Sequence, residues 1–167
     1  MSQFMLQTIS LTKESKFPKD LPVAALLTNP KTSQVLLTAH DTRISSGHPL
    51  NHAIITLLNQ LPSLLPADEI TATAPDIDPD DEEQYYANMY DVYITHEPCT
   101  MCCMALVHSR IRRLIFWKGM ATGARELGWM KGDEEGTLNH RYLCFEGIEC
   151  ALEEGIGVEE LGKDICV

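Results

Sequence analysis

The sequence has little positive charge. Its 13 lysines and arginines stand against 24 aspartates and glutamates, so the formal net charge is −11 and the pI is near 4.8. A protein that grips a nucleic-acid backbone unaided normally carries a basic face. The composition therefore argues against such a role for this chain alone. We expect either a small ligand or a basic surface supplied by a partner or by a further segment.

Long apolar runs are also absent. No stretch approaches the roughly 18 consecutive apolar residues of a membrane span, and residues 1–6 lack the basic region and apolar stretch of a secretory signal. We therefore expect an intracellular protein with no membrane partner, in a setting where thiols stay reduced. No internal repeat is visible, and 167 residues suit one domain over 1–167.

Periodicity and turn residues predict alternating helices and strands around one mixed sheet, an α/β sandwich. In chain order we expect an irregular helix over 1–20, then strands over 22–28 and 34–40 joined as a hairpin, and then a helix over 50–61 stopped by Pro62. A strand over 90–95, a helix over 99–109 and a strand over 112–117, parallel to the strand before it, follow, and the last strand is expected over 142–145. A short helix over 148–154 is a further candidate. Residues 64–86, rich in proline and acidic residues, predict a solvated insertion.

The most informative stretch is 93–103, which ends an apolar strand, turns at Pro98 and opens a helix with Cys99 and Cys102 one turn apart. Proline suits the first turn of a helix because its missing N–H would have no partner there. His52, near the start of the preceding helix, can complete the set. Zinc takes imidazole nitrogen and thiolate sulfur at tetrahedral corners. His52, Cys99 and Cys102 therefore predict a Zn²⁺ site with a fourth position open.

Other uses of these cysteines fit less well. A lone C-x-x-C is also the spacing of a redox pair, and a structural zinc finger would need a fourth side chain. The sequence has no second C-x-x-C or H-x-H at the usual spacing. We expect the remaining cysteines to be small, mostly buried residues: Cys103, Cys144, Cys150 and Cys166.

The pattern H-x-E…P-C-x-x-C belongs to the zinc-dependent nucleoside and nucleobase deaminases, and this chain departs from it once. Two residues after His52, where the pattern has glutamate, stands Ile54. In those enzymes the carboxylate moves the proton from the zinc-bound water to the substrate. Isoleucine can neither accept nor donate a proton, so we expect no catalytic residue here and no activity from the chain alone. Glu97 is an alternative shuttle if it faces the site; otherwise it orders its loop.

Five segments resemble the non-catalytic subunit of the eukaryotic heterodimeric tRNA adenosine deaminase, within the cytidine deaminase-like superfamily: 48–53, 90–95, 97–99, 104–111 and 138–142. The resemblance covers about residues 20–150. It implies a cytidine-deaminase-like fold, a three-layer sandwich with one central mixed sheet flanked by helices. It also implies a zinc-binding subunit that lacks the glutamate and pairs with a catalytic sister subunit.

In that family the heterodimer converts adenosine to inosine at the wobble position of tRNA anticodons, in the nucleus or the cytoplasm. The family subunit usually carries an additional N-terminal region that helps to bind tRNA. We therefore expect this chain to represent the deaminase domain only, with tRNA held by the whole assembly.

Two further features are left open by the sequence. The fourth zinc position can take water or a carboxylate from the C-terminus at Val167, since no catalytic need keeps that position clear. A partner or RNA surface has five candidates, each of which can equally be an ordinary solvated charge or a loop anchor: Arg110, Arg112, Arg113, His140 and Arg141.

Two other functions compete with the tRNA deaminase subunit. The first is a self-sufficient zinc deaminase of a free base or nucleoside, with Glu97 or another acid as shuttle. The second is a zinc-stabilised interaction module with no RNA task, which would form a homodimer and ignore a catalytic sister subunit.

Overall fold

The computed structural model describes residues 1–14, 20–64, 87, 90–124 and 140–147. In these ranges the helices and strands follow one another as α1 (Ser2–Leu11), the 3₁₀ turn η1 (Thr12–Glu14), β1 (Ala24–Asn29), β2 (Gln34–His40), α2 (Arg43–Ser46), α3 (Ala53–Leu64), β3 (Asp91–His96), α4 (Thr100–His108), β4 (Arg113–Lys118) and β5 (Leu143–Glu146). No helix within the described ranges is both long and apolar enough to cross a membrane.

The five strands form one mixed sheet in the order β2-β1-β3-β4-β5. The β1–β2 hairpin is antiparallel, and β1 also pairs antiparallel with β3. In contrast, β3, β4 and β5 run parallel, since α4 carries the chain from the end of β3 back to the start of β4. Carboxyl ends of parallel strands lie at one edge of a sheet, where α/β proteins place their ligands.

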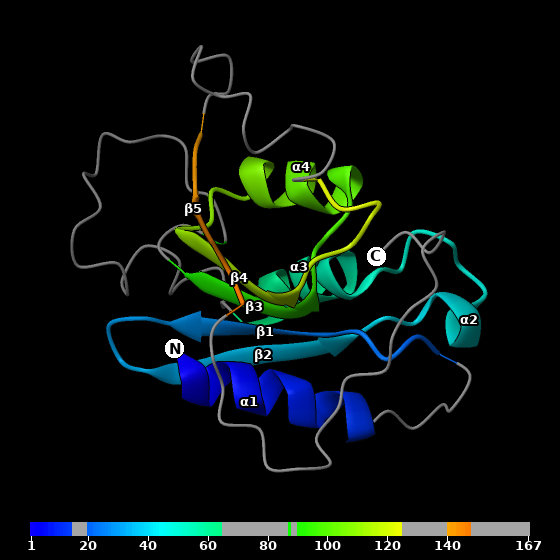
Figure 1. Cartoon of the computed structure of the whole chain (residues 1–167), viewed down its shortest axis with the longest axis horizontal. Coiled ribbons are helices and arrows are strands. Elements are labelled where there is room, and N and C mark those ends of the chain that lie inside the picture. The colour runs from blue at the N-terminus through cyan, green and yellow to red at the C-terminus, as the bar shows by residue number, and fades with distance from the viewer. Residues whose placement is uncertain (15–19, 65–86, 88–89, 125–139, 148–167) are drawn as a thin grey trace.

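Helices cover both faces of the sheet, which gives the three layers expected of the fold. Figure 1 shows α1 on one side of the strands and α3 and α4 on the other. On the α1 side, Met5 and Ile9 pack with Leu26, Tyr93 and Ile115. The opposite side holds the larger apolar cluster, to which α3 contributes Ile54 and Leu57 and α4 contributes Cys102 and Leu106.

The expected elements are confirmed wherever the structure describes them, with two differences. The helix expected to stop at Pro62 runs on to Leu64, because a proline in the last turn removes only one hydrogen bond while Leu61 is held in the core. The loop after β2 also contains a short helix, α2, which four residues cannot reveal through periodicity. The insertion over 65–86 and the helix candidate over 148–154 lie outside the described residues.

Candidate metal centre

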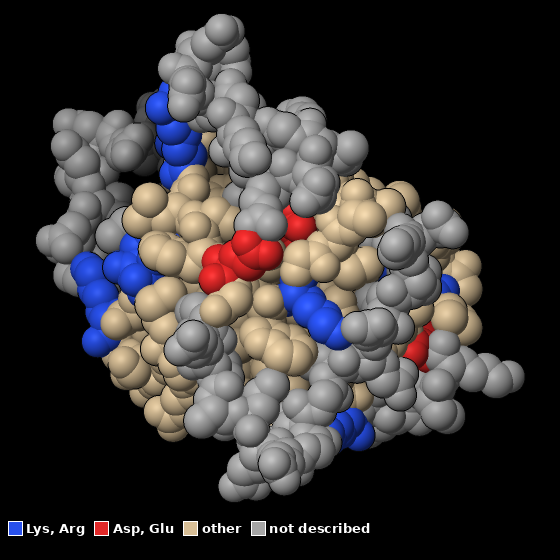
Figure 2. Space-filling view, in the orientation of Figure 1, with Lys and Arg blue, Asp and Glu red and all other residues tan. Residues whose placement is uncertain are grey.

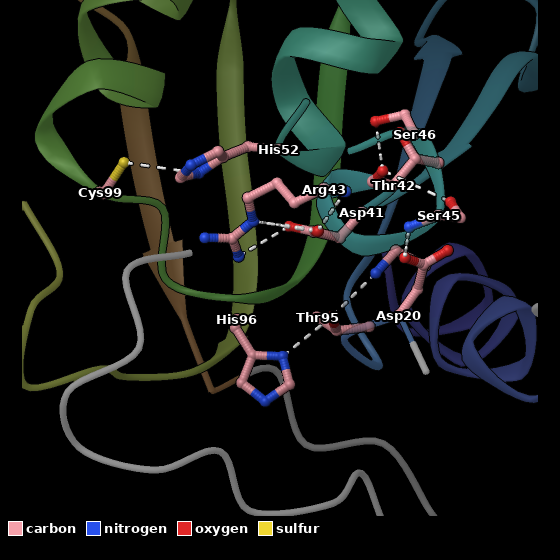
Figure 3. Close-up of polar contacts among 11 residues, drawn as sticks. Asp20, Asp41, Thr42, Arg43, Ser45, Ser46, His52, Thr95, His96 and Cys99 are labelled. Carbon is pink, nitrogen blue, oxygen red and sulfur yellow. Dashed lines mark hydrogen bonds and ion pairs between the residues drawn. The ribbon is translucent and has the colours of Figure 1, made fainter. Parts of the chain in front are cut away.

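The loop from Asp41 to Asn51 sets the position of His52. Asp41 is fully buried and accepts hydrogen bonds from the backbone N–H of Arg43 and from its Nε, at 3.2 and 2.9–3.0 Å. Thr42 N–H donates to the carbonyl of Asn51 at 3.0 Å, which closes the loop just before the histidine. The loop is therefore tied at both of its ends, and Figure 3 shows the contacts between Arg43 and Asp41.

His52 occupies the N-cap position of α3. Its carbonyl accepts the N–H of Thr56 at 2.9 Å, the first hydrogen bond of that helix. Cys99 is the N-cap residue of α4, with φ −71° and ψ 170°, and its carbonyl accepts the N–H of Cys103 at 2.9 Å. Two helix N-termini thus deliver the predicted ligands. The N–H groups and the dipole at a helix N-terminus favour negative charge, which stabilises a thiolate.

The three side chains come together. One ligand atom from each of His52, Cys99 and Cys102 lies within 4.8 Å of the others, and within the described ranges no other group of His, Cys, Asp and Glu does so. Cys99 Sγ is 3.8 Å from His52 Nδ1, and Figure 3 shows the two side chains pointing toward each other. Tetrahedral Zn–S and Zn–N bonds separate neighbouring ligand atoms by about 3.5–3.8 Å. The donors are buried, at 5%, 4% and 0% exposed. Donor type, spacing and burial therefore all fit zinc.

Ile54 lies two residues after His52 in the first turn of α3 and is 0% exposed. It belongs to the same apolar cluster as Cys99, Cys102 and Met120. On the α3 side, the residue that stands at the glutamate position therefore packs in an apolar cluster. Val167, the other candidate ligand, lies outside the part of the chain that the structure describes.

Glu97 precedes the metal loop and is 1% exposed. Its Oε2 accepts the backbone N–H of Met120 at 3.1 Å, from the segment that follows β4. This contact supports loop ordering, the second of the two roles considered for Glu97. The role of proton shuttle gains nothing from it, since the carboxylate is engaged with a backbone amide.

Cys103 is buried and adjacent to the predicted ligand Cys102, but its thiol has a different environment. Its Sγ donates to the carbonyl of Pro98 at 3.7 Å, and burial raises the pKa of its thiol to about 12, against a smaller opposing effect of the hydrogen bond with Tyr142. A protonated thiol of this kind is a packing residue. Cys144 is half-buried, as expected, and Cys150 and Cys166 lie beyond the described ranges.

The five candidate surface residues belong to stretches near the start of β3, where Arg112 and Arg113 contact Asp91, and the metal loop follows the other end of this strand, about 17 Å along it. His140 Nε2 donates to the carbonyl of Ile111 at 2.7 Å, and Leu143 N–H donates to the carbonyl of Arg112 at 3.2 Å. These contacts bring 140–143 beside 110–113. Arg110 and Arg141 belong to the same two stretches.

Two of these arginines are committed to one carboxylate. Asp91, at the start of β3, accepts from Arg112 Nε and Nη2 at 2.9 and 3.0 Å and from Arg113 Nε at 3.0 Å and its Nη2. Burial alone would raise the pKa of Asp91, but the hydrogen bonds from Arg113 and Arg112 outweigh it and hold that pKa below its ordinary value. Both guanidinium groups remain partly open to solvent, at 37% and 24% exposed.

Sequence reasoning identified the three side chains that come together, His52, Cys99 and Cys102, but it missed the residues that surround them. The sequence indicates Asp91 only as a strand residue, and it assigns no role to Met120 or Gly123. For Asp91 the available signal was an aspartate that opens one apolar strand and two arginines that open the next strand, expected to be parallel to it. For Gly123 there was none, because its neighbour Glu97 is distant in sequence.

Comparisons with known proteins agree with this centre. The family model described as "Cytidine and deoxycytidylate deaminase zinc-binding region" matches residues 1–118. The chain is 31% identical over 159 residues to the "Probable inactive tRNA-specific adenosine deaminase-like protein 3" of Danio rerio, covering 89% of this chain and 47% of that protein. It is 35% identical over 133 residues to the "tRNA-specific adenosine deaminase subunit tad3" of Schizosaccharomyces pombe, covering 77% and 39%.

This chain thus spans less than half the length of those two relatives. Among solved structures, one from a study of A-to-I editing by tRNA:A34 deaminases at the wobble position superposes with a TM-score of 0.65. The match covers 87% of this chain and 98% of that one at 22% identity, which shows a shared fold.

Proposed function

The chain belongs to the cytidine and deoxycytidylate deaminase family, and from that premise we propose that it is the non-catalytic, zinc-binding subunit of a tRNA adenosine deaminase. The reaction of the complex is conversion of adenosine to inosine at the wobble position of the anticodon. The names of the relatives from Danio rerio and Schizosaccharomyces pombe support this assignment, one as a probable inactive deaminase and one as a subunit.

One observation carries the proposal: a complete His, Cys, Cys centre stands beside a fully buried isoleucine. General acid–base catalysis is worth a factor of about 10²–10⁴, and the hydrocarbon side chain of Ile54 supplies none of it. The contact of Glu97 Oε2 with the N–H of Met120 supports a role for Glu97 in ordering the loop. On this proposal, the chain holds zinc through His52, Cys99 and Cys102, and position 54 offers no group that can move the proton.

Zinc held by His52, Cys99 and Cys102 has a structural task in this proposal. The ion would neutralise two thiolates and join the N-termini of α3 and α4, whose packing shapes the surface offered to a partner. The fourth position goes to water or to the C-terminal carboxylate of Val167, as no reaction requires it to stay open. Removal of zinc should then separate the chain from its partner.

The proposed partners are a catalytic deaminase subunit, in a heterodimer, and tRNA bound by the assembly in the nucleus or the cytoplasm. On the face shown in Figure 2, the lysines and arginines of the described residues lie in separate places rather than in one basic patch. Together with the net charge of −11, this favours RNA binding that needs further surfaces. Arg110, Arg112, Arg113, His140 and Arg141 are the part of the chain that we propose for partner or RNA contact.

The test is inosine formation in tRNA by this chain alone, by a catalytic sister subunit alone and by the two mixed. We expect activity only in the mixture, and loss of it when the chain carries Cys99→Ser. Activity from the chain alone would contradict the proposal and favour the self-sufficient deaminase.

Co-purification of the two subunits is the second readout. A stable complex without activity would show that the partnership exists and that an RNA-binding region is still needed. A homodimer that ignores the sister subunit would instead favour the zinc-stabilised interaction module.

A further inference from the structure

The segment 119–124 after β4 is fastened to the metal loop at two points. At one, the N–H of Met120 donates to Oε2 of Glu97 at 3.1 Å. At the other, the N–H of Ala124 donates to the carbonyl of Pro98 at 3.0 Å. Glu97 and Pro98 are consecutive residues, and both bonds end directly before the first cysteine ligand. The segment 119–124 is therefore hydrogen-bonded to the two residues that precede Cys99.

Gly123 makes room for the buried carboxylate. A Cβ atom on this residue would lie 2.2 Å from Cδ and 2.5 Å from Oε2 of Glu97, far inside contact distance. The φ of Gly123 lies outside the left-handed range, so glycine is needed here for space and not for backbone conformation. Glu97 is 1% exposed, so its carboxylate is enclosed beside Gly123.

Glu97 and Pro98 are also held by α4 and by β4. The carbonyl of Pro98 accepts a second hydrogen bond, from Cys103 Sγ at 3.7 Å on the first turns of α4. The Glu97 N–H donates to the carbonyl of Lys118 at 2.7 Å, at the end of β4. Residues 97 and 98 are thus held by β4, by α4 and by the 119–124 segment. Without the Glu97 carboxylate, the 119–124 segment loses the hydrogen bond from the N–H of Met120.

We propose that Glu97, seated against Gly123, is a positioning residue for the metal centre: it fixes the backbone before Cys99 so that this thiolate meets His52 at the spacing zinc requires. The inference rests on the proposed zinc binding. It assigns Glu97 a purpose other than proton transfer. It also explains why a buried acid sits next to a site that performs no chemistry of its own.

Four variants test the proposal through the zinc dissociation constant, measured by competition with a chromogenic chelator. Glu97→Ala should weaken zinc binding about 10–100-fold, the usual effect of losing a group that orients a metal ligand. Glu97→Gln keeps an oxygen that accepts the Met120 N–H, so it should bind zinc within a few-fold of the parent chain. Gly123→Ala should weaken binding as much as Glu97→Ala, because the methyl group displaces the carboxylate.

The double variant Glu97→Ala with Gly123→Ala decides whether the two residues act through each other. Once the carboxylate is gone, the methyl group at 123 has space, so the double variant should bind zinc no more weakly than Glu97→Ala alone. An equal cost of Gly123→Ala in both backgrounds would overturn the proposal. Unchanged zinc affinity in Glu97→Ala would overturn it as well.

Two controls separate this proposal from general loss of stability and from failure of the zinc assignment. Ile9→Ala removes core contacts on the α1 side of the sheet, away from the metal loop, and should lower stability without changing zinc affinity. Amide hydrogen exchange of Met120 in metal-free protein should accelerate in Glu97→Ala and not in Glu97→Gln. Absence of zinc binding by the parent chain would contradict the proposed function. The hydrogen exchange of Met120 would still test the contact between Met120 and Glu97.

Discussion

A single buried carboxylate at the head of β3 holds two guanidinium groups, and its energetic role can be measured. Asp91 is 1% exposed, so it leaves water on folding and recovers that cost through its hydrogen bonds with Arg112 and Arg113. Because the two arginines stay partly solvated, they can return to water when the carboxylate is removed. The cost of losing Asp91 should therefore be moderate.

Asp91→Asn should lower the free energy of unfolding by about 2 kcal/mol near neutral pH, because hydrogen bonds to charged groups contribute about 1.5–3 kcal/mol. The pKa of Asp91 is lowered in the folded chain from its ordinary value of 3.8. Its contribution is therefore complete above pH 3.8 and is lost as the pH falls through the lower folded pKa. Urea unfolding of both proteins over a pH series measures this. A difference that stayed constant into acid would contradict the assignment.

The cysteines of α4 offer a matched pair of substitutions. Cys102→Ser removes a proposed zinc ligand and should reduce the bound zinc to well below one ion per chain, as measured by elemental analysis after gel filtration. Cys103→Ser, the adjacent position, should keep its zinc, because a hydroxyl can donate to the Pro98 carbonyl as the thiol does. Zinc loss in Cys103→Ser with retention in Cys102→Ser would reverse the ligand assignment.

At the scale of elements, the end of α4 shows an arginine where glycine would fit the backbone better. Arg110 has φ 55°, its N–H donates to the carbonyl of Val107 at 3.0 Å, and the next N–H, of Ile111, donates to Leu106 at 3.4 Å. This is the Schellman arrangement, in which a left-handed residue after the helix is usually glycine. Ile111 and Leu106 are both fully buried, which completes the motif.

Arg110→Gly should leave stability unchanged or raise it by up to about 1 kcal/mol, because glycine adopts the left-handed conformation without the steric strain of about 1–2 kcal/mol but adds chain entropy to the unfolded state. Arg110→Ala keeps that conformation and isolates the side chain. Chemical unfolding of both variants checks the expectation. A clear loss of stability in Arg110→Gly would show that contacts of the arginine side chain outweigh the strain.

The elements that sequence predicted well are those with a long periodic signal. The strand expected over 34–40 is found at Gln34–His40, and the parallel pairing of β3 with β4 follows from the helix between them. Sequence failed where tertiary packing decides. Pro62 does not stop α3, and the four residues of α2 are held by Asp41 rather than by their own propensity.

For the site, spacing along the sequence was sufficient to predict Cys99 and Cys102 as a pair of ligands. It did not predict the contacts of Glu97 and Asp91. Cys99 and Cys102 are one turn apart, so their shared purpose is visible in the sequence. The partners of Glu97 and Asp91 are 23 and 21 residues away. Contacts at such separations depend on the register of β3 against β4, which composition does not determine.

At the scale of the whole molecule, charge decides what the chain can bind alone. With a net charge of −11, it should bind tRNA no more tightly than about 10⁻⁴ M at about 0.15 M salt, at the weak end of non-specific binding. The mixture with a catalytic subunit should bind more tightly and weaken as salt rises. Fluorescence anisotropy with labelled tRNA across a salt series tests both. Tight, salt-sensitive binding by the chain alone would require a basic surface that its composition argues against.

The complete burial of Ile54 also bears on how the chain can evolve. A glutamate at this position would enter an apolar cluster already closed around the isoleucine, and an acid that loses its hydration there destabilises the fold. Such a glutamate could act as a proton shuttle only after further substitutions that open the cluster. Replacement of Ile54 by glutamate alone would therefore lower stability without adding activity. The proposed division of labour between two subunits would therefore be protected against reversal by the packing of Ile54.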